Sequence, residues 1–307
     1  MIFIKAIILL SVLMLITAMF TYFERKILAA VQLRLGPNVV GYRGLLQPFA
    51  DGIKLLCKQI LFPKRVNKIL FIATPIWTLT CSLSVWLFVP THIMGPLMRN
   101  EFSLLIIVGL QALAAFGTCM AGLISQTYFS KLGALRNIAQ TMSVKICSLL
   151  CLICIGLFWN SFDLEKIAEY HFSIWMLPIA FVYFCCCLAE DNRTPFDTLE
   201  AEQELVAGYH TEYSSILFGF FYISEYLNIL LSSVMISLLF FGGYHFPFLP
   251  DSVIWLAIKT LLIASLIFLT RATLPRYTFR QIMRIFWRGL SPFALAFLIA
   301  EIFFKVQ

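Results

Sequence analysis

Residues 2–22 read IFIKAIILLSVLMLITAMFTY, an apolar run in which Lys5 is the only charged residue. About 20 apolar residues carry a helix across the hydrocarbon core of a bilayer. A transmembrane barrel would instead show short segments of alternating apolar and polar residues. The long, continuous run therefore predicts a membrane-spanning helix. Glu24, Arg25 and Lys26 close it and no small-residue cleavage site follows, so we expect it to remain as a first span rather than a signal peptide.

The composition of the whole chain agrees with this interpretation. Of 307 residues, 61% are hydrophobic and only 13% are charged, and the mean hydropathy is +0.89. A soluble protein carries roughly a quarter of its residues as charges. In lipid, every backbone N–H and C=O must be hydrogen-bonded within the structure, which leaves helix bundles and closed barrels. We therefore expect an all-α, polytopic membrane protein.

Seven further apolar runs are long enough to be transmembrane helices. The eight predicted spans are residues 2–22, 69–90, 101–122, 141–158, 173–190, 214–241, 252–270 and 289–305. The longest polar stretch, residues 23–68, is too short for a separate soluble domain, and no repeat or flexible linker is visible. We expect residues 1–307 to form a single integral membrane domain.

Lysine and arginine are distributed unequally between the connecting loops. The loops after the first, third, fifth and seventh predicted spans hold 17 of them, and the other three loops hold 2. Positively charged loops remain on the side from which a membrane protein is inserted. The odd-numbered loops are therefore expected on the matrix or cytoplasmic side, here called the inner side. The net charge of +7 then reflects orientation and lipid contact rather than nucleic-acid binding.

The cysteines and histidines do not form a metal-binding pattern. Cys151 and Cys154 make a C-x-x-C, but inside an apolar run without a second pair, and Cys185, Cys186 and Cys187 point in different directions around a helix. Cysteine commonly serves as a small buried hydrophobe. We expect no cofactor bound covalently or by metal ligation.

The first inner loop, residues 24–59, contains a turn and then a second helical pattern. After the turn at Gly36-Pro37-Asn38, apolar residues recur at helical spacing, namely Leu45, Leu46, Phe49, Ile53, Leu56 and Ile60. This pattern predicts an amphipathic helix at the membrane surface. It is either a peripheral anchor or part of a functional site.

A second inner loop, residues 189–213, is strongly acidic. It contains seven carboxylates and a single cation, Arg193. The acids are Glu190, Asp191, Asp197, Glu200, Glu202, Glu204 and Glu212. Neighbouring carboxylates repel unless cations or shared protons compensate, and sharing raises and couples their pKa values. The loop is consistent with a proton relay or with an acidic docking surface for a basic partner.

The third inner segment is basic. Arg276, Arg280, Arg284 and Arg288 recur every four residues, which would place them on one face of a helix. Such a stripe attracts anionic lipid headgroups. Pairing with the acidic loop is the alternative, and both interactions are compatible.

Two charged residues lie inside predicted spans and suggest function. A charge at mid-bilayer is expensive and is by default a functional hypothesis. Lys145, like Lys259, is long enough to reach the interface by snorkelling. Glu225 is too short for that, so we expect it to be a buried protonatable group.

Four segments resemble the subunit 1 (H-type) family of respiratory complex I. They are ERKILAAVQLRLGPNVVGYRGLLQPFADGIKLL (24–56), SKLGALRNIAQTMS (130–143), AEDNRTPFDTLEAEQELVAGYHTEYS (189–214) and LTRATLPR (269–276). The resemblance implies a membrane subunit of the proton-pumping NADH:ubiquinone oxidoreductase, with an incomplete active site on this chain alone. It also implies that ubiquinone is the substrate, bound at the interface with neighbouring subunits, and that this chain binds no flavin, iron–sulfur cluster or metal.

The resemblance also assigns residues. It implies a quinone tunnel lined or supported by Glu24, Arg25, Gln32, Arg34, Arg193, Phe196 and Asp197. It implies a proton-coupling network of Glu190, Glu200, Glu202, Glu204, Glu212, Glu225, Lys145 and Arg271. The implied partners are quinone-site subunits of the hydrophilic arm, and small and antiporter-like membrane subunits. The implied location is the mitochondrial inner membrane, with a bacterial plasma membrane as the alternative.

The chain departs from the family at Lys145, where the family usually has a glutamate. We expect Lys145 to be neutral or paired with an acid, either Glu190 or Glu225. The family pattern also occurs, less closely, in membrane anchors of hydrogenase-type complexes. A stand-alone ion carrier is a further alternative, although no inverted repeat is detectable.

Overall fold

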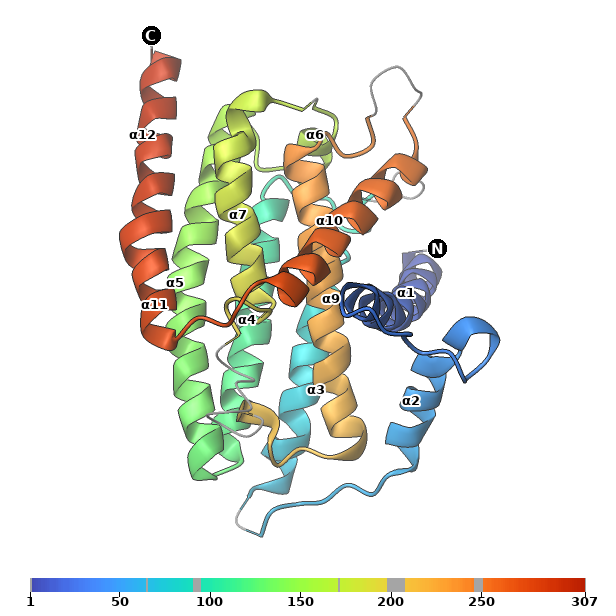
Figure 1. The fold of residues 1–307 in the computed structure, drawn as a ribbon. Helices are drawn as coiled ribbons and strands as arrows, with labels where there is room; N and C mark the ends of the chain where they lie inside the picture. The colour runs from blue at the N-terminus through green and yellow to red at the C-terminus, as the bar shows by residue number, and fades with distance from the viewer. Residues whose placement is uncertain are drawn as a thin grey trace.

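The computed structural model describes residues 2–64, 66–90, 95–170, 172–197, 208–245 and 251–306. Within these ranges the chain is helical and contains no strand (Figure 1). The longer helices are α1 (Ile2–Val31), α3 (Lys68–Val85), α4 (Ser103–Ile124), α5 (Tyr128–Phe158), α7 (Leu177–Glu190), α9 (Ser215–Phe240), α10 (Val253–Thr273) and α12 (Ser291–Val306). The shorter ones are α2 (Gln47–Cys57), α6 (Leu164–Ala168) and α11 (Phe279–Ile285).

The prediction of an all-α polytopic membrane protein is confirmed. Seven helices in the described part of the chain are long and apolar enough to cross a bilayer: α1, α3, α4, α5, α9, α10 and the continuous stretch Phe279–Lys305. The predicted fifth span corresponds to a shorter apolar helix, Ile174–Glu190. Its regular part, α7, has 14 residues and is about 21 Å long, less than the ~30 Å of a bilayer core.

Two helices extend beyond their predicted spans. α1 continues to Val31, so Glu24, Arg25 and Lys26 are helical rather than the start of a loop. α5 begins at Tyr128, thirteen residues before the predicted start at residue 141. Each extension buries some of its polar residues: Glu24 is 1% exposed, and Asn137 and Gln140 in α5 are buried.

The prediction that the four arginines form a basic stripe on one helix face is wrong. α11 starts only at Phe279, where Thr278 forms a capping box with Gln281, so Arg276 lies before the helix. Arg288 lies in a π-helical turn, Phe286–Leu290. The angle between successive residues differs there from that of an α-helix, so a spacing of four residues no longer keeps Arg288 on the same face. Arg276 instead pairs with Asp197 at 3.1 Å, which is the acidic-loop alternative.

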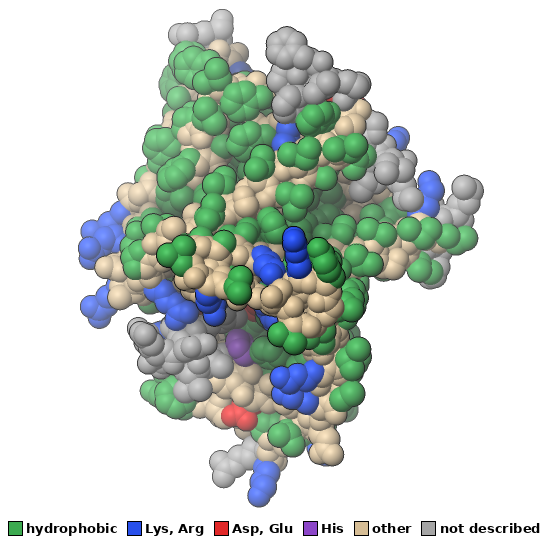
Figure 2. Space-filling view, turned by 45° about the vertical axis from the view of Figure 1, so that its right-hand side comes forward, with side chains coloured by type: hydrophobic (Ala, Val, Ile, Leu, Met, Phe, Trp, Pro, Cys, Tyr) green, Lys and Arg blue, Asp and Glu red, His purple; other side chains and the backbone are tan. Residues whose placement is uncertain are grey.

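α9 lies at the centre of the bundle and 83% of its apolar window is buried. It packs against α3 on one side and α1, α10 and α7 on others, while α2 lies beside its first half (Figure 1). α10 crosses the bundle obliquely, and α1 is seen nearly along its axis. The outer face in Figure 2 is largely hydrophobic, with Lys and Arg gathered mostly over its middle and lower part.

The contact between α3 and α4 depends on a glycine. A Cβ added to Gly117 would lie 2.4 Å from Cγ2 of Thr78, whose hydroxyl donates to the Pro75 carbonyl at 2.8 Å. Thr78 is β-branched and buried, so it cannot rotate away without losing that bond. Gly109, in the same helix, faces open space.

Gly117→Ala should therefore destabilise the assembled protein, whereas Gly109→Ala should not. Overpacking of this kind costs about 1–3 kcal/mol, while alanine at an exposed helical position is slightly favourable. The measurement is the thermal unfolding midpoint of the purified detergent-solubilised assembly. Equal midpoints for the two variants would show that the α3–α4 contact is not as tight as described.

Candidate functional site

Glu24 is the centre of a buried ion-pair cluster. Its Oε1 accepts hydrogen bonds from Nη1 of Arg193, at 3.4 Å, and from Nη1 of Arg271. The three residues come from α1, from the turn after α7 and from the last turn of α10. A buried carboxylate is tolerated only when cations and hydrogen bonds replace its hydration. The cluster therefore joins three distant parts of the chain.

The turn after α7 is shaped to present Arg193. Asn192 adopts a left-handed backbone conformation, with φ of 51°, and the Arg193 N–H returns to the Leu188 carbonyl at 3.1 Å. Gln140 of α5 supports the same turn by donating to the carbonyls of Ala189 and Phe196, both at 3.0 Å. The Arg193 guanidinium also lies over the ring of Tyr226, 5.2 Å from its centroid.

An apolar cavity lies between α1, α2 and α9, beside this cluster. It has a volume of about 390 Å³. Its lining is mostly aliphatic and aromatic and consists of Met14, Thr17, Ala18, Thr21, Arg25, Pro48, Phe49, Asp51, Gly52, Ile53, Leu55, Leu56, Gly219, Tyr222, Ile223 and Tyr226. Tyr226 lines the cavity and contacts Arg193, so the cavity reaches the Glu24 cluster.

A salt bridge joins α1 to α2 at the cavity. Arg25 donates to Asp51 at 2.7 Å, and Gln47 donates to the other oxygen of Asp51 at 3.0 Å. Both charged side chains are more than a third exposed, so this pair contributes at most about 1 kcal/mol. Its effect is to fix α2 against α1 as one wall of the cavity.

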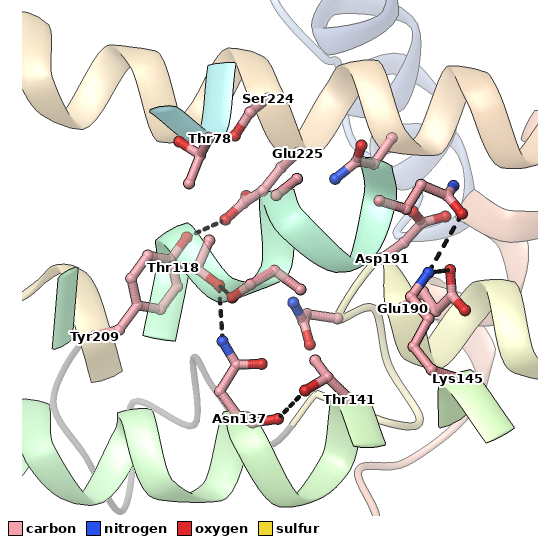
Figure 3. Close-up of a pocket in the computed structure, with 15 residues that line it drawn as sticks. Thr78, Thr118, Asn137, Thr141, Lys145, Glu190, Asp191, Tyr209, Ser224 and Glu225 are labelled. Atoms are coloured by element: carbon pink, nitrogen blue, oxygen red, sulfur yellow. Dashed lines mark hydrogen bonds and ion pairs between the residues drawn. The ribbon is translucent and has the colours of Figure 1, made fainter. Parts of the chain in front are cut away.

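On the other side of α9 the side chains form a small polar chamber (Figure 3). It has a volume of about 50 Å³, which is room for a few water molecules. Glu225 lies at one end, where it accepts from the hydroxyl of Tyr209 at 2.7 Å. Glu190 and Lys145 lie at the other end. The chamber is lined by polar groups of α3, α4, α5, α7 and α9, including Thr78, Gln111, Thr118, Asn137, Thr141, Ser224 and Asn228.

Lys145 is paired with Glu190. Its Nζ donates to Oε2 of Glu190 at 2.8 Å and to Oε1 of Gln111 at 3.3 Å. The hydroxyl of Ser148 donates to the other Glu190 oxygen at 2.9 Å. Of the two acids considered from the sequence, Glu190 is the partner in the structure, while Glu225 bonds Tyr209.

Asp191 lies beside this pair and is 6% exposed. Burial, only partly offset by a hydrogen bond from Ser232 at 2.7 Å, raises the pKa of Asp191 to about 7. The neighbouring Glu190 raises this pKa further, and Arg193 and Lys145 lower it. A carboxyl group of this kind exchanges its proton near neutral pH.

The remaining residues assigned from the resemblance are distributed as follows. Gln32 and Arg34 are exposed just beyond α1. Phe196 is buried and packs edge-on against Phe286, with ring centroids 5.5 Å apart. Glu212 is half-buried before α9, and Glu200, Glu202 and Glu204 lie outside the described residues.

Three further polar residues were not singled out from the sequence. Tyr209, Ser148 and Ser232 each donate to a carboxylate of the site, at 2.7, 2.9 and 2.7 Å. Ser148 and Ser232 are ordinary small residues of apolar helices, so only their spatial neighbours reveal them. Tyr209 follows Gly208 within the acidic loop, and its place in that loop is the sequence feature that could have identified it. Within the described ranges, no group of three His, Cys, Asp or Glu side chains is placed to hold a metal ion.

The fold and site together define a polytopic membrane protein with an apolar cavity on one side of a central helix and a buried polar chamber on the other. The NADH dehydrogenase family profile matches residues 4–302. The H chain of the NADH-quinone oxidoreductase of Vesicomyosocius okutanii is 37% identical over 312 residues, covering 96% of this chain and 87% of that protein. NADH-ubiquinone oxidoreductase chain 1 of Bradypus variegatus is 38% identical, covering 92% and 90%. The same chain of Mycosarcoma maydis is 40% identical, covering 92% and 89%.

The chain belongs to this family of NADH-quinone oxidoreductase membrane subunits. The family assignment made from the four sequence segments is thereby confirmed.

The raised pKa of Asp191 predicts a titration near pH 7 in the purified assembly. Infrared difference spectra between pH 6 and pH 8 should contain the carbonyl band of a protonated carboxylic acid that Asp191→Asn removes. Ser232→Ala should shift the titration to higher pH, because it deletes the hydrogen bond that favours the ionised form.

Asp51→Asn serves as the control, because it removes a carboxylate outside the chamber and leaves Asp191 in place. A band that survives in the Asp191→Asn variant would assign the titration to another group.

Proposed function

We propose that this chain forms the lipid-side entrance and part of the tunnel for ubiquinone, and that it couples quinone reduction to proton translocation. The observation that carries the proposal is the apolar cavity between α1, α2 and α9, which is lined by Tyr226, the residue that contacts Arg193. The quinone would be reduced together with partner subunits of the complex, since the proposal gives this chain no complete active site.

The cavity matches the two parts of a quinone. The isoprenoid tail is apolar, and the aliphatic lining formed by Met14, Ile53, Leu56 and Ile223 accommodates it. The headgroup is polar and becomes charged or protonated on reduction. Tyr222 and Tyr226, whose hydroxyls are 3.1 Å apart, offer it hydrogen bonds at the inner end of the cavity.

The ion-pair cluster supports a route from the quinone to the chamber. Arg193 contacts Tyr226 on the cavity side, and two residues earlier in the same turn Asp191 lines the chamber. The charges to compare are one on the reduced quinone and one on a carboxylate of the chamber. Two unit charges about 10 Å apart interact by roughly 1.7 kcal/mol at an effective dielectric constant of 20. That energy is about one pKa unit, enough to change the charge of a group that titrates near neutral pH.

Within the chamber, the proton route would run between Glu190 and Glu225 through the intervening polar groups and water. Lys145 places its amino group at one end of this route, at a position where the family pattern usually has an acid. The pairing with Glu190 supplies the compensation that makes a lysine tolerable at this depth. Arg271, Glu212 and the acids of residues 198–207 would extend the network toward the inner side.

The proposed assembly consists of the quinone-site subunits of the hydrophilic arm and the small and antiporter-like membrane subunits. Anionic phospholipid would contact the arginines of α11 and the following turn. The proposed location of the assembly is the mitochondrial inner membrane, with the odd-numbered loops of this chain on the matrix side. Native electrophoresis with an NADH dehydrogenase stain identifies the assembly and excludes a hydrogenase-type complex if the flavin and iron–sulfur subunits co-migrate.

Gly52→Phe should narrow the quinone entrance. Gly52 lines the cavity, and a Cβ added to it would have no atom within 4 Å, so the larger residue extends into free space. We expect the KM for a long-chain ubiquinone to rise on the order of tenfold, equivalent to about 1.4 kcal/mol of binding. NADH oxidation by ferricyanide, which does not use the quinone tunnel, should be unchanged.

Gly109→Phe is the matched control, because Gly109 also faces open space but lies in α4, away from the cavity. An unchanged KM for long-chain ubiquinone in a fully assembled Gly52→Phe variant would contradict the proposed entrance.

Lys145→Glu tests the proton route. The substitution sets two carboxylates side by side, and such a pair shares a proton with raised, coupled pKa values. Assembly and the number of protons translocated per NADH oxidised should be retained or improved. Lys145→Met, which leaves Glu190 without its cation, should reduce both.

Lys166→Glu provides the control for an equal change in charge, since Lys166 is exposed and distant from the chamber. Abolished assembly in Lys145→Glu, with normal assembly in Lys166→Glu, would refute the proposed role of the pair.

A further inference from the structure

A second lipid-facing cavity lies away from the proposed quinone entrance, where α12 meets the end of α5 and the start of the α7 segment. Its volume is about 400 Å³. Four aromatic residues line it, together with Glu301 and Lys305; the aromatics are Phe158, Trp175, Phe297 and Phe304. None of these residues belongs to the ion-pair cluster or to the polar chamber.

Glu301 is the unusual member of this cavity. It is only 8% exposed, and neither of its carboxylate oxygens has a hydrogen-bond partner among the described residues. Burying a carboxylate without hydrogen-bond partners costs far more free energy than burying a neutral polar group, because nothing replaces the water that hydrated the charge. The side chain therefore lacks a donor, and preferably a positively charged one.

Lys305 does not supply this donor. It lies one turn further along α12, but its Nζ donates to the Leu157 carbonyl and, at 2.5 Å, to Oδ1 of Asn160. The ammonium is thereby held against the C-terminal end of α5, where helix carbonyls favour a cation. It remains exposed at the mouth of the cavity.

The aromatic walls suit a cation. The faces of Trp and Phe rings attract ammonium groups, with Trp the most favourable. Trp175 and Phe304 are each 74% exposed, so the cavity opens to the surface of the helix bundle. Trp and Lys at helix ends are typical of the headgroup level of a bilayer. The cavity thus combines a buried anion, an exposed cation at its mouth and aromatic faces.

We propose that this cavity binds the headgroup of a phosphatidylethanolamine molecule. The primary ammonium donates to Glu301 and lies against the aromatic rings, while the phosphate contacts Lys305. The apolar part of the cavity, formed by Phe297 and Phe304, receives the start of an acyl chain.

The chemistry selects ethanolamine among the common headgroups. A choline ammonium has no N–H to donate, so it would leave the Glu301 oxygens unsatisfied. A glycerol headgroup carries no cation, and a serine headgroup adds a carboxylate that Glu301 would repel. This lipid site is independent of the proposed quinone tunnel, and either proposal can fail without the other.

Photolabelling of the intact purified assembly tests the proposal. The probe is a phosphatidylethanolamine with a diazirine on its acyl chain, present at a trace level in phosphatidylcholine vesicles. Peptide mass spectrometry should locate label on α12 and around Trp175. Unlabelled phosphatidylethanolamine should displace it, and added phosphatidylcholine or phosphatidylglycerol should not.

Glu301→Gln should lower labelling at this site on the order of tenfold, whereas Glu101→Gln, which neutralises an exposed acid, should leave it unchanged. Equal displacement by phosphatidylcholine would reduce the cavity to a nonspecific lipid groove and overturn the proposal. Absence of label in the intact assembly would also overturn it, and would indicate that a neighbouring subunit covers the cavity. The competition on the unmodified protein remains decisive if the Glu301 variant fails to assemble.

Discussion

The requirement that a charge buried in a membrane protein be compensated within the protein explains much of this structure. Glu24 is almost inaccessible and is compensated by Arg193 and Arg271, residues 169 and 247 positions away. These bonds specify where α1, the turn after α7 and the end of α10 must meet. A separate salt bridge between Arg25 and Asp51 fixes α2 against α1, so the apolar cavity lies beside this cluster.

α9 separates the two environments that the proposed function needs. Consecutive residues of a helix point about 100° apart, and Glu225 and Tyr226 use this property. Glu225 lines the polar chamber, while Tyr226 lines the apolar cavity and contacts Arg193. The cavity excludes water with aliphatic side chains, and the chamber admits a few waters between titratable groups. In the proposed function, a single buried helix would therefore keep quinone and protons apart while holding them within electrostatic range.

The sequence predicted the helical membrane fold and most of the residues of the candidate site, but not how far some helices extend. Continuous apolar runs identify spans because lipid permits few alternatives. The sequence suggested a loop at residues 24–26 because these residues are charged. The arginines that compensate Glu24 and allow α1 to continue, Arg193 and Arg271, are distant in sequence. Arg276 looked like part of a helical stripe, although the capping box at Thr278 starts the helix after it. Lys145 was expected to pair with one of two acids, and only the packing of α5 against α7 distinguished Glu190 from Glu225.

The shortness of α7 has an electrical consequence. The helix covers about 21 Å, less than the ~30 Å of a bilayer core, and the chain turns directly after it, at Asp191. Where polar side chains and water replace hydrocarbon beside a short helix, the transmembrane voltage falls across a thinner insulating layer. Moving one charge through 100 mV requires about 2.3 kcal/mol. In the proposed mechanism, proton transfer in the chamber would therefore experience part of the membrane potential, and the protonmotive force would act back on the carboxylates that the quinone is proposed to control.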